Sequence, residues 1–331
     1  MSLRTIFTAA TAVVVAAGVL ADAASATAPG ENGSITFRRY LGPDRTKGAI
    51  FTIAPDGTGE RQLTRPPGEL SDDFPDFASD GSFVAFQRCN ATCAVYTVRT
   101  NGTRLRRVGP ACTGHRLPPR CSDSAYPAIS PNRELIAFEH AFGEIRDDQI
   151  DHVGIYVMRS NGSHVRRVTL PPTRAAEDIE PQWSPDGRRI VFTRFNVTAE
   201  PAGQAAIFTV KADGTDLRQV TPWDMNAGDG PDWSPDGSEI LFRAPQTEDF
   251  LNSNVYAIHP DGTGLRQITN VAPGTKIYSS SYSPDGSSIT FGMTGVDGAA
   301  DVFTMNADGT GIKPVTRTPL WDSAPDWGGI K

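Results

Sequence analysis

The chain has 331 residues, of which 38 are acidic and 31 basic, so its formal net charge is −7. This charge argues against nucleic acid as a ligand, because affinity for a phosphate backbone requires a basic surface. It also argues against docking on an anionic membrane, which attracts clusters of Lys and Arg.

The first 26 residues have the pattern of a secretory signal peptide. Arg4 supplies the positive start, residues 6–20 form an apolar run, and Ala24-Ser25-Ala26 is a small-residue cleavage site. The run is short for a membrane span, and an uncleaved anchor helix is the alternative. We therefore expect an exported protein, periplasmic or extracellular, whose mature chain is one domain over residues 27–331.

One pattern, [IV]-[FY]-x-[IVM]-x-x-[DN]-G-[ST], recurs along the rest of the chain. Its copies begin at Ile50, Val95, Ile155, Ile207, Val255 and Val302. A period of roughly 45–60 residues is the range of β-propeller blades. Each repeat therefore represents one supersecondary unit that buries its faces against its neighbours.

Every repeat carries four strand signals. A P-x-[WF] strand leads into an S-P-D-G turn, as at 184–187, and such a turn suits a tight hairpin. The second strand alternates with period two, the third is the recurring pattern itself, and a short R-x-[LVI]-T edge strand follows its [DN]-G hairpin. The alternating pairs of the second strand are Ile35/Phe37, Val84/Phe86, Ile136/Phe138, Ile190/Phe192, Ile240/Phe242 and Ile289/Phe291.

The two ends of the repeat array complement each other. The array opens at Ser34 with a second-strand motif and ends at residues 324–329 with a first-strand motif that has no partner. We expect the C-terminal strand to complete the N-terminal blade, giving an all-β, six-bladed propeller closed by its terminal strands. Trp183, Trp233 and Tyr282 are expected to fill the gaps between blades.

Four cysteines, Cys89, Cys93, Cys112 and Cys121, fall within one repeat. In an exported chain an even, clustered set indicates disulfides. Of three possible pairings we favour the local one, Cys89 with Cys93 and Cys112 with Cys121. A zinc site is the alternative, although the cysteine spacing is irregular for it.

The repeat P-x-W-S-P-D-G…I-x-F…[IV]-[FY]-x-[MVI]-x-x-D-G-[ST]…R-x-[LVI]-T resembles the WD-like β-propeller repeat of TolB-type proteins, over residues 34–327. TolB is a periplasmic protein of an envelope system. The resemblance therefore implies a monomeric binding module for an envelope or extracellular protein, a peptide or a glycan. Some lyases that act on uronate oligosaccharides carry similar propellers, so a polysaccharide-acting lyase or hydrolase that uses channel-mouth carboxylates is the alternative.

Function in such a fold normally lies in the loops at one face of the propeller, here called the funnel. Acidic residues precede most first strands, and Tyr278 lies there in the last full repeat. They fit a charged funnel for a cationic group, a metal or a partner's basic segment, or carboxylates that brace their own turns. The candidate ligand-binding residues are Asp73, Asp123, Asp178, Asp229, Tyr278 and Asp322.

A metal site is a weaker candidate, in the long loop of the third repeat. Its residues His140, Asp147, Asp148, Asp151 and His152 mix imidazole and carboxylate ligands. Exposed acidic loops are common and no known spacing such as the EF-hand register is met, so an exposed loop without a metal is the preferred interpretation. The five histidines of the chain form no Ser/His/Asp or Cys/His pattern, so we predict no catalytic residues and no cofactor beyond a divalent cation.

Overall fold

A computed structural model describes residues 30–110, 124–142, 152–173, 176–196, 204–245, 253–294 and 298–330. Over these residues the chain is built almost entirely of β-strands, and the single helical element there is the 3-10 turn η1, Trp223–Met225. Within the same residues no helix has the length and apolarity to cross a membrane. The expected signal peptide lies outside the described residues.

The strands in chain order are β1 (Glu31–Tyr40), β2 (Gly48–Ile53), β3 (Arg61–Gln62), β4 (Ser71–Phe77), β5 (Phe83–Cys89), β6 (Cys93–Arg99), β7 (Arg106–Arg107), β8 (Ser124–Ile129), β9 (Leu135–Phe142), β10 (His152–Arg159), β11 (Arg166–Arg167), β12 (Ala176–Trp183), β13 (Arg189–Asn196), β14 (Gln204–Lys211), β15 (Arg218–Gln219), β16 (Gly228–Trp233), β17 (Ile240–Pro245), β18 (Ser253–Ile258), β19 (Arg266–Gln267), β20 (Ile277–Tyr282), β21 (Ser288–Thr294), β22 (Ala300–Asn306), β23 (Lys313–Pro314) and β24 (Asp322–Ile330).

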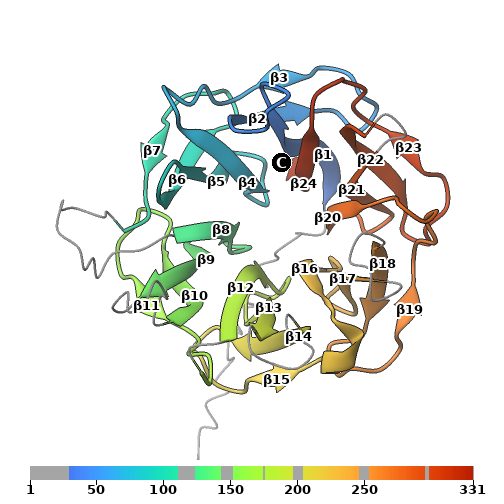
Figure 1. The fold of residues 1–331 in the computed structure, drawn as a ribbon. Coiled ribbons are helices and arrows are strands. Elements are labelled where there is room, and N and C mark those ends of the chain that lie inside the picture. The colour runs from blue at the N-terminus through green and yellow to red at the C-terminus, as the bar shows by residue number, and fades with distance from the viewer. Residues whose placement is uncertain are drawn as a thin grey trace, which may run out of the picture.

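The strands group into antiparallel units of four. The runs β4 to β7, β16 to β19 and β20 to β23 are separate four-stranded sheets, and β24 joins β1, β2 and β3 in another. The runs β8 to β11 and β12 to β15 share one eight-stranded sheet through a parallel contact of β10 with β12. Each unit is named below by its first strand. Figure 1 shows the units arranged around a central axis, with β24, β4, β8, β12, β16 and β20 innermost.

The end of the chain lies beside its beginning. Strand β24 pairs antiparallel with β1, with Trp327 opposite Ile35. The Trp327 indole Nε1 also donates to the Gly33 carbonyl at 3.2 Å. This is the strand pairing expected from the unpartnered motif at residues 324–329.

The second strands carry the core, as their period-two pattern predicts. Phe37, Phe86, Phe192, Phe242 and Phe291 are fully buried. Each of these rings stacks on an aromatic ring of the third strand, with centroids 5.7–5.9 Å apart. Such pairs add about 0.5–1.5 kcal/mol each beyond the burial of their area.

Aromatic side chains also join neighbouring units. Trp183 packs against the core of the β8 unit and donates from Nε1 to the Ala128 carbonyl at 3.1 Å. Trp233 and Tyr282 lie in equivalent clusters and are 3% and 2% exposed. The sequence prediction that these three residues fill the gaps between units is confirmed.

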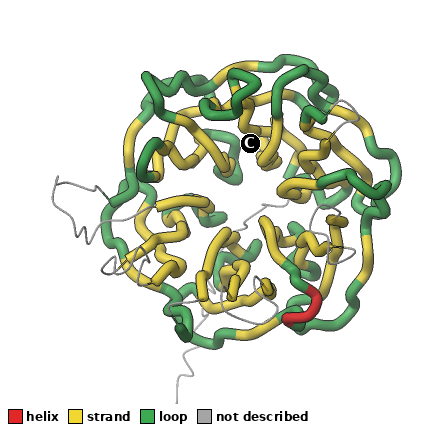
Figure 2. Tube along the Cα trace, in the orientation of Figure 1, coloured by secondary structure: helices red, strands yellow, loops and turns green. Residues whose placement is uncertain are grey.

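The outer margin of each unit is a very short strand reached through the [DN]-G hairpin. Figure 2 shows these short segments as the outermost strands of the ring. In the first hairpin the Asp56 carboxylate accepts from the Thr58 backbone N–H at 2.9 Å and its hydroxyl at 2.7 Å. Gly57 has a φ of 83°, which only glycine adopts readily. The recurring motif is therefore explained by hairpin geometry.

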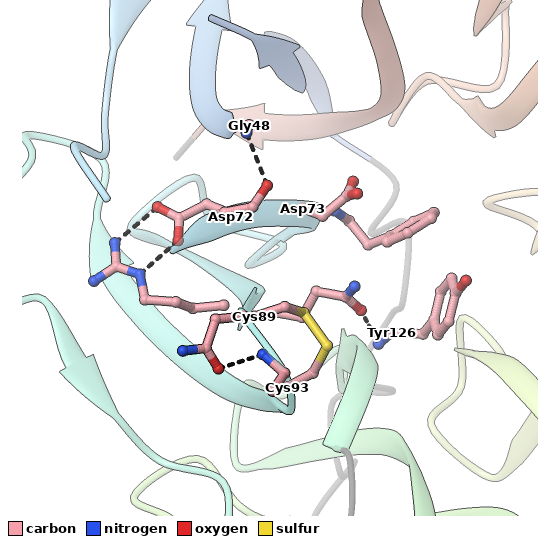
Figure 3. The surroundings of a disulfide bond; sticks show 12 residues. Gly48, Asp72, Asp73, Cys89, Cys93 and Tyr126 are labelled. Atoms are coloured by element: carbon pink, nitrogen blue, oxygen red, sulfur yellow. Dashed lines mark hydrogen bonds and ion pairs between the residues drawn. A yellow bond between two sulfur atoms is a disulfide. The ribbon is translucent and has the colours of Figure 1, made fainter. Parts of the chain in front are cut away.

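A disulfide joins Cys89 to Cys93 across the hairpin between β5 and β6 (Figure 3). This agrees with the favoured pairing. The predicted partner bond between Cys112 and Cys121 lies outside the described residues.

Candidate functional site

A bulge interrupts every inner strand at the same register, where the ladder pairing shifts. The residue at each bulge has a positive φ, between 26° and 75°. For residues other than glycine this conformation costs of order 1–3 kcal/mol, and bulges re-aim side chains. These residues line a cavity of about 80 Å³ on the central axis. The bulge residues are Phe74, Tyr126, Glu180, Gly230, Ser279 and Ala324.

Two residues further along, five of the six inner strands carry a polar side chain, the exception being Ala128 on β8, and these side chains form a layer across the axis. The Asp76 carboxylate accepts from the Ile129 backbone N–H at 2.7 Å, and Asp326 accepts from the Phe77 N–H at 2.7 Å. Asp232 repeats the arrangement with the Tyr282 N–H at 2.9 Å. Each carboxylate thus binds the backbone of the next unit around the axis.

The remaining oxygens of this layer are engaged as well. Gln182 donates from Nε2 to Asp76 at 2.8 Å, and the Ser281 hydroxyl donates to Asp326 at 3.0 Å. The axial cavity therefore has a polar floor of mutually hydrogen-bonded side chains. These residues hold units together, which was not predicted from the sequence.

Burial raises the pKa of each of these carboxyls, and for Asp76 and Asp232 the charge of Asp326 raises it further. The pKa of Asp232 rises to about 7 and that of Asp326 to about 6. The pKa of Asp76 lies well above its usual value, first because of burial and then because of the charge of Asp326. Backbone N–H donors oppose the rise because they favour the ionised form.

The predicted funnel acids do not form one ring. Asp178 and Asp322 are fully buried. Asp178 binds the Arg194 guanidinium through two bonds of 2.6 and 2.9 Å, and Asp322 binds Arg39 at 2.7 and 2.8 Å. Both carboxylates face the second strand of their unit and are closed off from the channel. They are members of buried ion pairs, which lose several kcal/mol when one partner is removed.

Asp73 occupies a different register and lies at the channel mouth. Figure 3 shows it pointing to a different side of β4 from its neighbour Asp72, which pairs with an arginine as Asp178 does. Asp73 forms an ion pair with Arg38 and is about 14% exposed. Tyr278 is half-buried at the same mouth. Asp229 lies on β16, but its side chain is outside the described part of the molecule, as is all of Asp123.

The two described metal candidates lie on neighbouring strands. His140 on β9 is buried, with Nδ1 3.0 Å from the Ser124 hydroxyl and its ring against Tyr156. His152 is on β10. Asp147, Asp148 and Asp151 lie outside the described residues, and within those residues no cluster of three or more potential ligands has metal-binding geometry.

An aromatic surface at the channel mouth is the feature that sequence reasoning missed. Phe74 contacts Tyr126 with ring centroids 4.2 Å apart, and the Arg38 guanidinium lies 4.2 Å from the Tyr40 ring. The Tyr40 backbone N–H donates to the carbonyl of Trp321 at 3.0 Å. We call this surface the aromatic band; its members are Tyr40, Phe74, Tyr126, Tyr278 and Trp321, together with Arg38 and Arg45.

The other end of the band has ring contacts of its own. The Trp321 ring lies 5.2 Å from Tyr278, and Arg45 stacks 3.6 Å above Trp321. All five rings are half-buried, so part of each is accessible to solvent. Of these residues, only Tyr278 belonged to the predicted set. In two units the residue before the proline of the inner strand is aromatic, namely Phe74 and Tyr126. This pattern is the signal from which the sequence could have indicated them.

No family model matches the chain, and no curated protein matches it. Solved structures do. TolB from Acinetobacter baumannii aligns with a TM-score of 0.68 and 16% identity, over 91% of this chain and 68% of that one. A putative TolB from Agrobacterium tumefaciens gives a TM-score of 0.58 and 21% identity, over 86% and 88%. An oligogalacturonate lyase in complex with manganese aligns with a TM-score of 0.52 and 15% identity, over 88% of this chain and 75% of that one. The chain therefore has the TolB-like propeller fold expected from its repeat.

Proposed function

We propose that this protein is an exported β-propeller that binds a protein or peptide segment at the mouth of its central channel, as a monomer. We infer six blades, the eight-stranded sheet being two of them, closed by β24 and β1. The pairing of these strands supports the closure, as does an apolar cluster that joins Val302 and Val315 to the β24 unit. Export rests on the signal-like pattern of residues 1–26.

The aromatic band carries the proposal. Trp, Tyr and Arg are the residues most enriched among those that dominate binding energies at protein interfaces. Here the five rings are half-buried, and cation–π contacts hold Arg45 and the buried Arg38 against two of them. Pre-ordered side chains lose little conformational entropy on binding, so more of the contact energy appears as affinity.

The size of the axial cavity indicates what kind of ligand fits. Its volume of about 80 Å³ is far below the roughly 300–1,000 Å³ of sites that enclose a drug-sized molecule. The floor of Asp76, Gln182 and Asp326 seals it from below. A ligand must therefore lie across the mouth, with at most one side chain inserted, and a protein segment suits this shape.

The charge at the mouth is divided between its two sides. Arg38 and Arg45 lie in the band, whereas Glu180 projects from the opposite inner strand into the axial cavity. Glu180 accepts from the Gly230 backbone N–H at 2.7 Å, and burial raises its pKa. A segment that presents an aromatic or aliphatic side chain to the band and a donor group to Glu180 would match both sides.

The rival function is a polysaccharide-acting lyase or hydrolase, and the likeness to a lyase fold is its support. Hydrolysis by a carboxylate pair requires two carboxyl groups that reach the scissile bond. The carboxylates nearest the axis instead use their oxygens to accept hydrogen bonds from neighbouring units. We therefore place binding first.

The test uses capture by the immobilised mature chain, residues 27–331, from the envelope and secreted fractions of the host. A double variant, Tyr278→Ala and Trp321→Ala, removes the exposed end of the band. A control double variant, Leu217→Ala and Leu265→Ala, removes two outer-edge side chains that are 46% and 52% exposed. Circular dichroism confirms that all three proteins are folded.

The proposal predicts a partner that the wild type and the control retain and the band variant loses. Truncating an aromatic side chain that dominates the binding energy of an interface costs at least about 2 kcal/mol, which is roughly a thirtyfold weaker Kd. Equal retention by all three proteins would refute the band as the binding surface. If the wild type retains nothing, protein binding fails, and turnover of polysaccharides becomes the question.

A further inference from the structure

A cavity of about 510 Å³ lies between the β4 and β8 units, where the short outer strand β7 is found (Figure 1). This volume is within the roughly 300–1,000 Å³ of sites that enclose a small molecule. The cavity is lined by Phe83 at the start of β5, Arg99 at the end of β6 and Ser160 in the hairpin after β10. Asp73, at the channel mouth, lies toward the opposite end of β5, beside Gln87. The cavity is therefore separate from the aromatic band.

Among the described residues that line this cavity there are three arginines and no acidic residue. Arg99, Arg104 and Arg106 are exposed, and a guanidinium keeps its positive charge at any physiological pH. Arg106 donates to the Ser160 carbonyl at 2.8 Å, so its guanidinium is held at the boundary between the two units. This concentration of positive charge stands on a chain whose net charge is −7. We call the cavity and its three arginines the arginine groove.

The β12 unit shows how another unit neutralises the same positions. Its Asp216 carboxylate accepts from Arg218 at 2.8 Å and from Arg189 at 2.8 Å. In the alignment of the repeats, Arg106 corresponds to Arg218, and Arg104 corresponds to Asp216. The β4 unit therefore carries a further cation at the position where the β12 unit has its acid.

The backbone at Arg104 favours glycine over arginine. Its φ is 56°, and a bulky residue rarely adopts a positive φ because this conformation costs free energy. Half of the units have a glycine there. In chain order the six residues at this position are Gly59, Arg104, His164, Asp216, Gly264 and Gly311. The hairpin gains nothing from an arginine, which indicates a role outside folding.

The rest of the lining favours one kind of anion. Guanidinium groups match sulfate, phosphate and carboxylate groups. Ser82, Thr100 and Asn101 carry groups that can both donate and accept hydrogen bonds, as sugar hydroxyls do. Phe83 is half-buried and offers part of an apolar ring. A sugar with acid groups matches all three features, whereas an acidic peptide would rely mainly on the arginines.

We propose that the arginine groove binds an oligosaccharide that carries sulfate, phosphate or carboxylate groups. Arg99, Arg104 and Arg106 bind the acid groups, and Phe83 packs against a sugar ring. Because the chain as a whole is acidic, the groove is a local site of attraction for such a ligand. The site does not depend on the partner proposed for the channel mouth.

The repeat itself supplies the variants that test the groove. Arg104→Gly copies three other units, and since glycine suits the positive φ, this variant should melt at the wild-type temperature or above it. Arg104→Asp copies the β12 unit and should pair with Arg106 inside the groove. Arg106→Gln removes one charge. Arg166→Gln is its matched control, because Arg166 donates to the Ala212 carbonyl at 2.8 Å just as Arg106 donates to Ser160.

The measurement is isothermal titration calorimetry of the mature chain, residues 27–331, at low and at high salt. The acidic probes are a disulfated disaccharide, digalacturonic acid and glucose 6-phosphate, which separate sulfate, carboxylate and phosphate as the recognised group. Maltose is the neutral sugar, and a triglutamate peptide represents an acidic ligand without sugar hydroxyls. Thermal melts confirm that every variant is folded.

The expected result is binding of at least one acidic sugar, at least tenfold more tightly than maltose or triglutamate, and more weakly at high salt. Arg104→Gly, Arg104→Asp and Arg106→Gln should each weaken this binding at least tenfold, whereas Arg166→Gln should leave it unchanged. If no acidic sugar binds the wild type, or if triglutamate binds equally well, the proposal is wrong. Binding that survives Arg104→Gly at full strength would overturn it as well.

Discussion

We make a quantitative prediction for the polar floor of the channel, about how the stability of the fold depends on pH. In Asp326→Asn the amide oxygen can still accept from the Phe77 N–H, and the amide nitrogen can donate to the Ser281 hydroxyl. The variant therefore keeps both contacts and removes one buried negative charge. It separates the cost of that charge from the benefit of the hydrogen bonds.

The magnitude follows from the pKa. Asp326 titrates at about 6 in the folded protein and at 3.8 in the reference state. Because the folded pKa is the higher one, the folded state holds the proton more tightly, and stability falls as pH rises from about 4 to above 6. The two pKa values differ by about two, and a difference of one corresponds to about 1.36 kcal/mol, so the free energy of unfolding of the wild type falls by at most about 3 kcal/mol over this window. The Asn variant lacks this loss.

The assay is urea denaturation of the wild type and the variant at intervals between pH 4 and pH 7.5. The free energy of unfolding of the variant, minus that of the wild type, should rise with pH by up to about 3 kcal/mol. Asp56→Asn is the control. Hydrogen bonds from Thr58 lower the pKa of that exposed carboxyl, so its difference should not rise. A difference for Asp326→Asn that is flat or falls with pH would refute the reasoning.

Three other predictions concern the rest of the framework. Arg194→Met leaves the Asp178 carboxylate buried without its cation, so urea denaturation should show a loss of about 3–5 kcal/mol, and adding Asp178→Ile should recover most of it. Cys89→Ser with Cys93→Ser should cost only about 2 kcal/mol, because the disulfide closes a short loop; a loss twice as large would contradict this. Deleting residues 324–331 removes most of β24 and should abolish the single cooperative thermal transition, whereas an unchanged melting curve would contradict the proposed closure.

Much of the fold could be predicted because it repeats. Period-two alternation identified Phe37 and its equivalents as core, and all are buried. The pattern at residues 324–329 predicted a first strand with no partner in its own repeat, and this strand, β24, pairs with β1. Each motif occurs in several repeats, so an irregular copy can be recognised by comparison with the regular ones.

The site was harder to predict because it depends on register. An acidic residue near the start of an inner strand belongs to a partly exposed ion pair at position 73 but to a fully buried ion pair at positions 178 and 322. A one-residue difference in a strand turns a side chain to the other face. The aromatic band was beyond sequence reasoning for another reason: Tyr40 and Trp321 are 281 positions apart and meet only because β1 and β24 pair.

The most direct test of binding at the channel mouth is a photocrosslink formed in the living host. A photoreactive phenylalanine replaces Tyr278 in the aromatic band or Leu265 on the outer edge, one position at a time. Binding at the mouth predicts a discrete protein adduct from the Tyr278 position and none from the Leu265 position. An adduct from the outer edge alone, or none from either position, would contradict it.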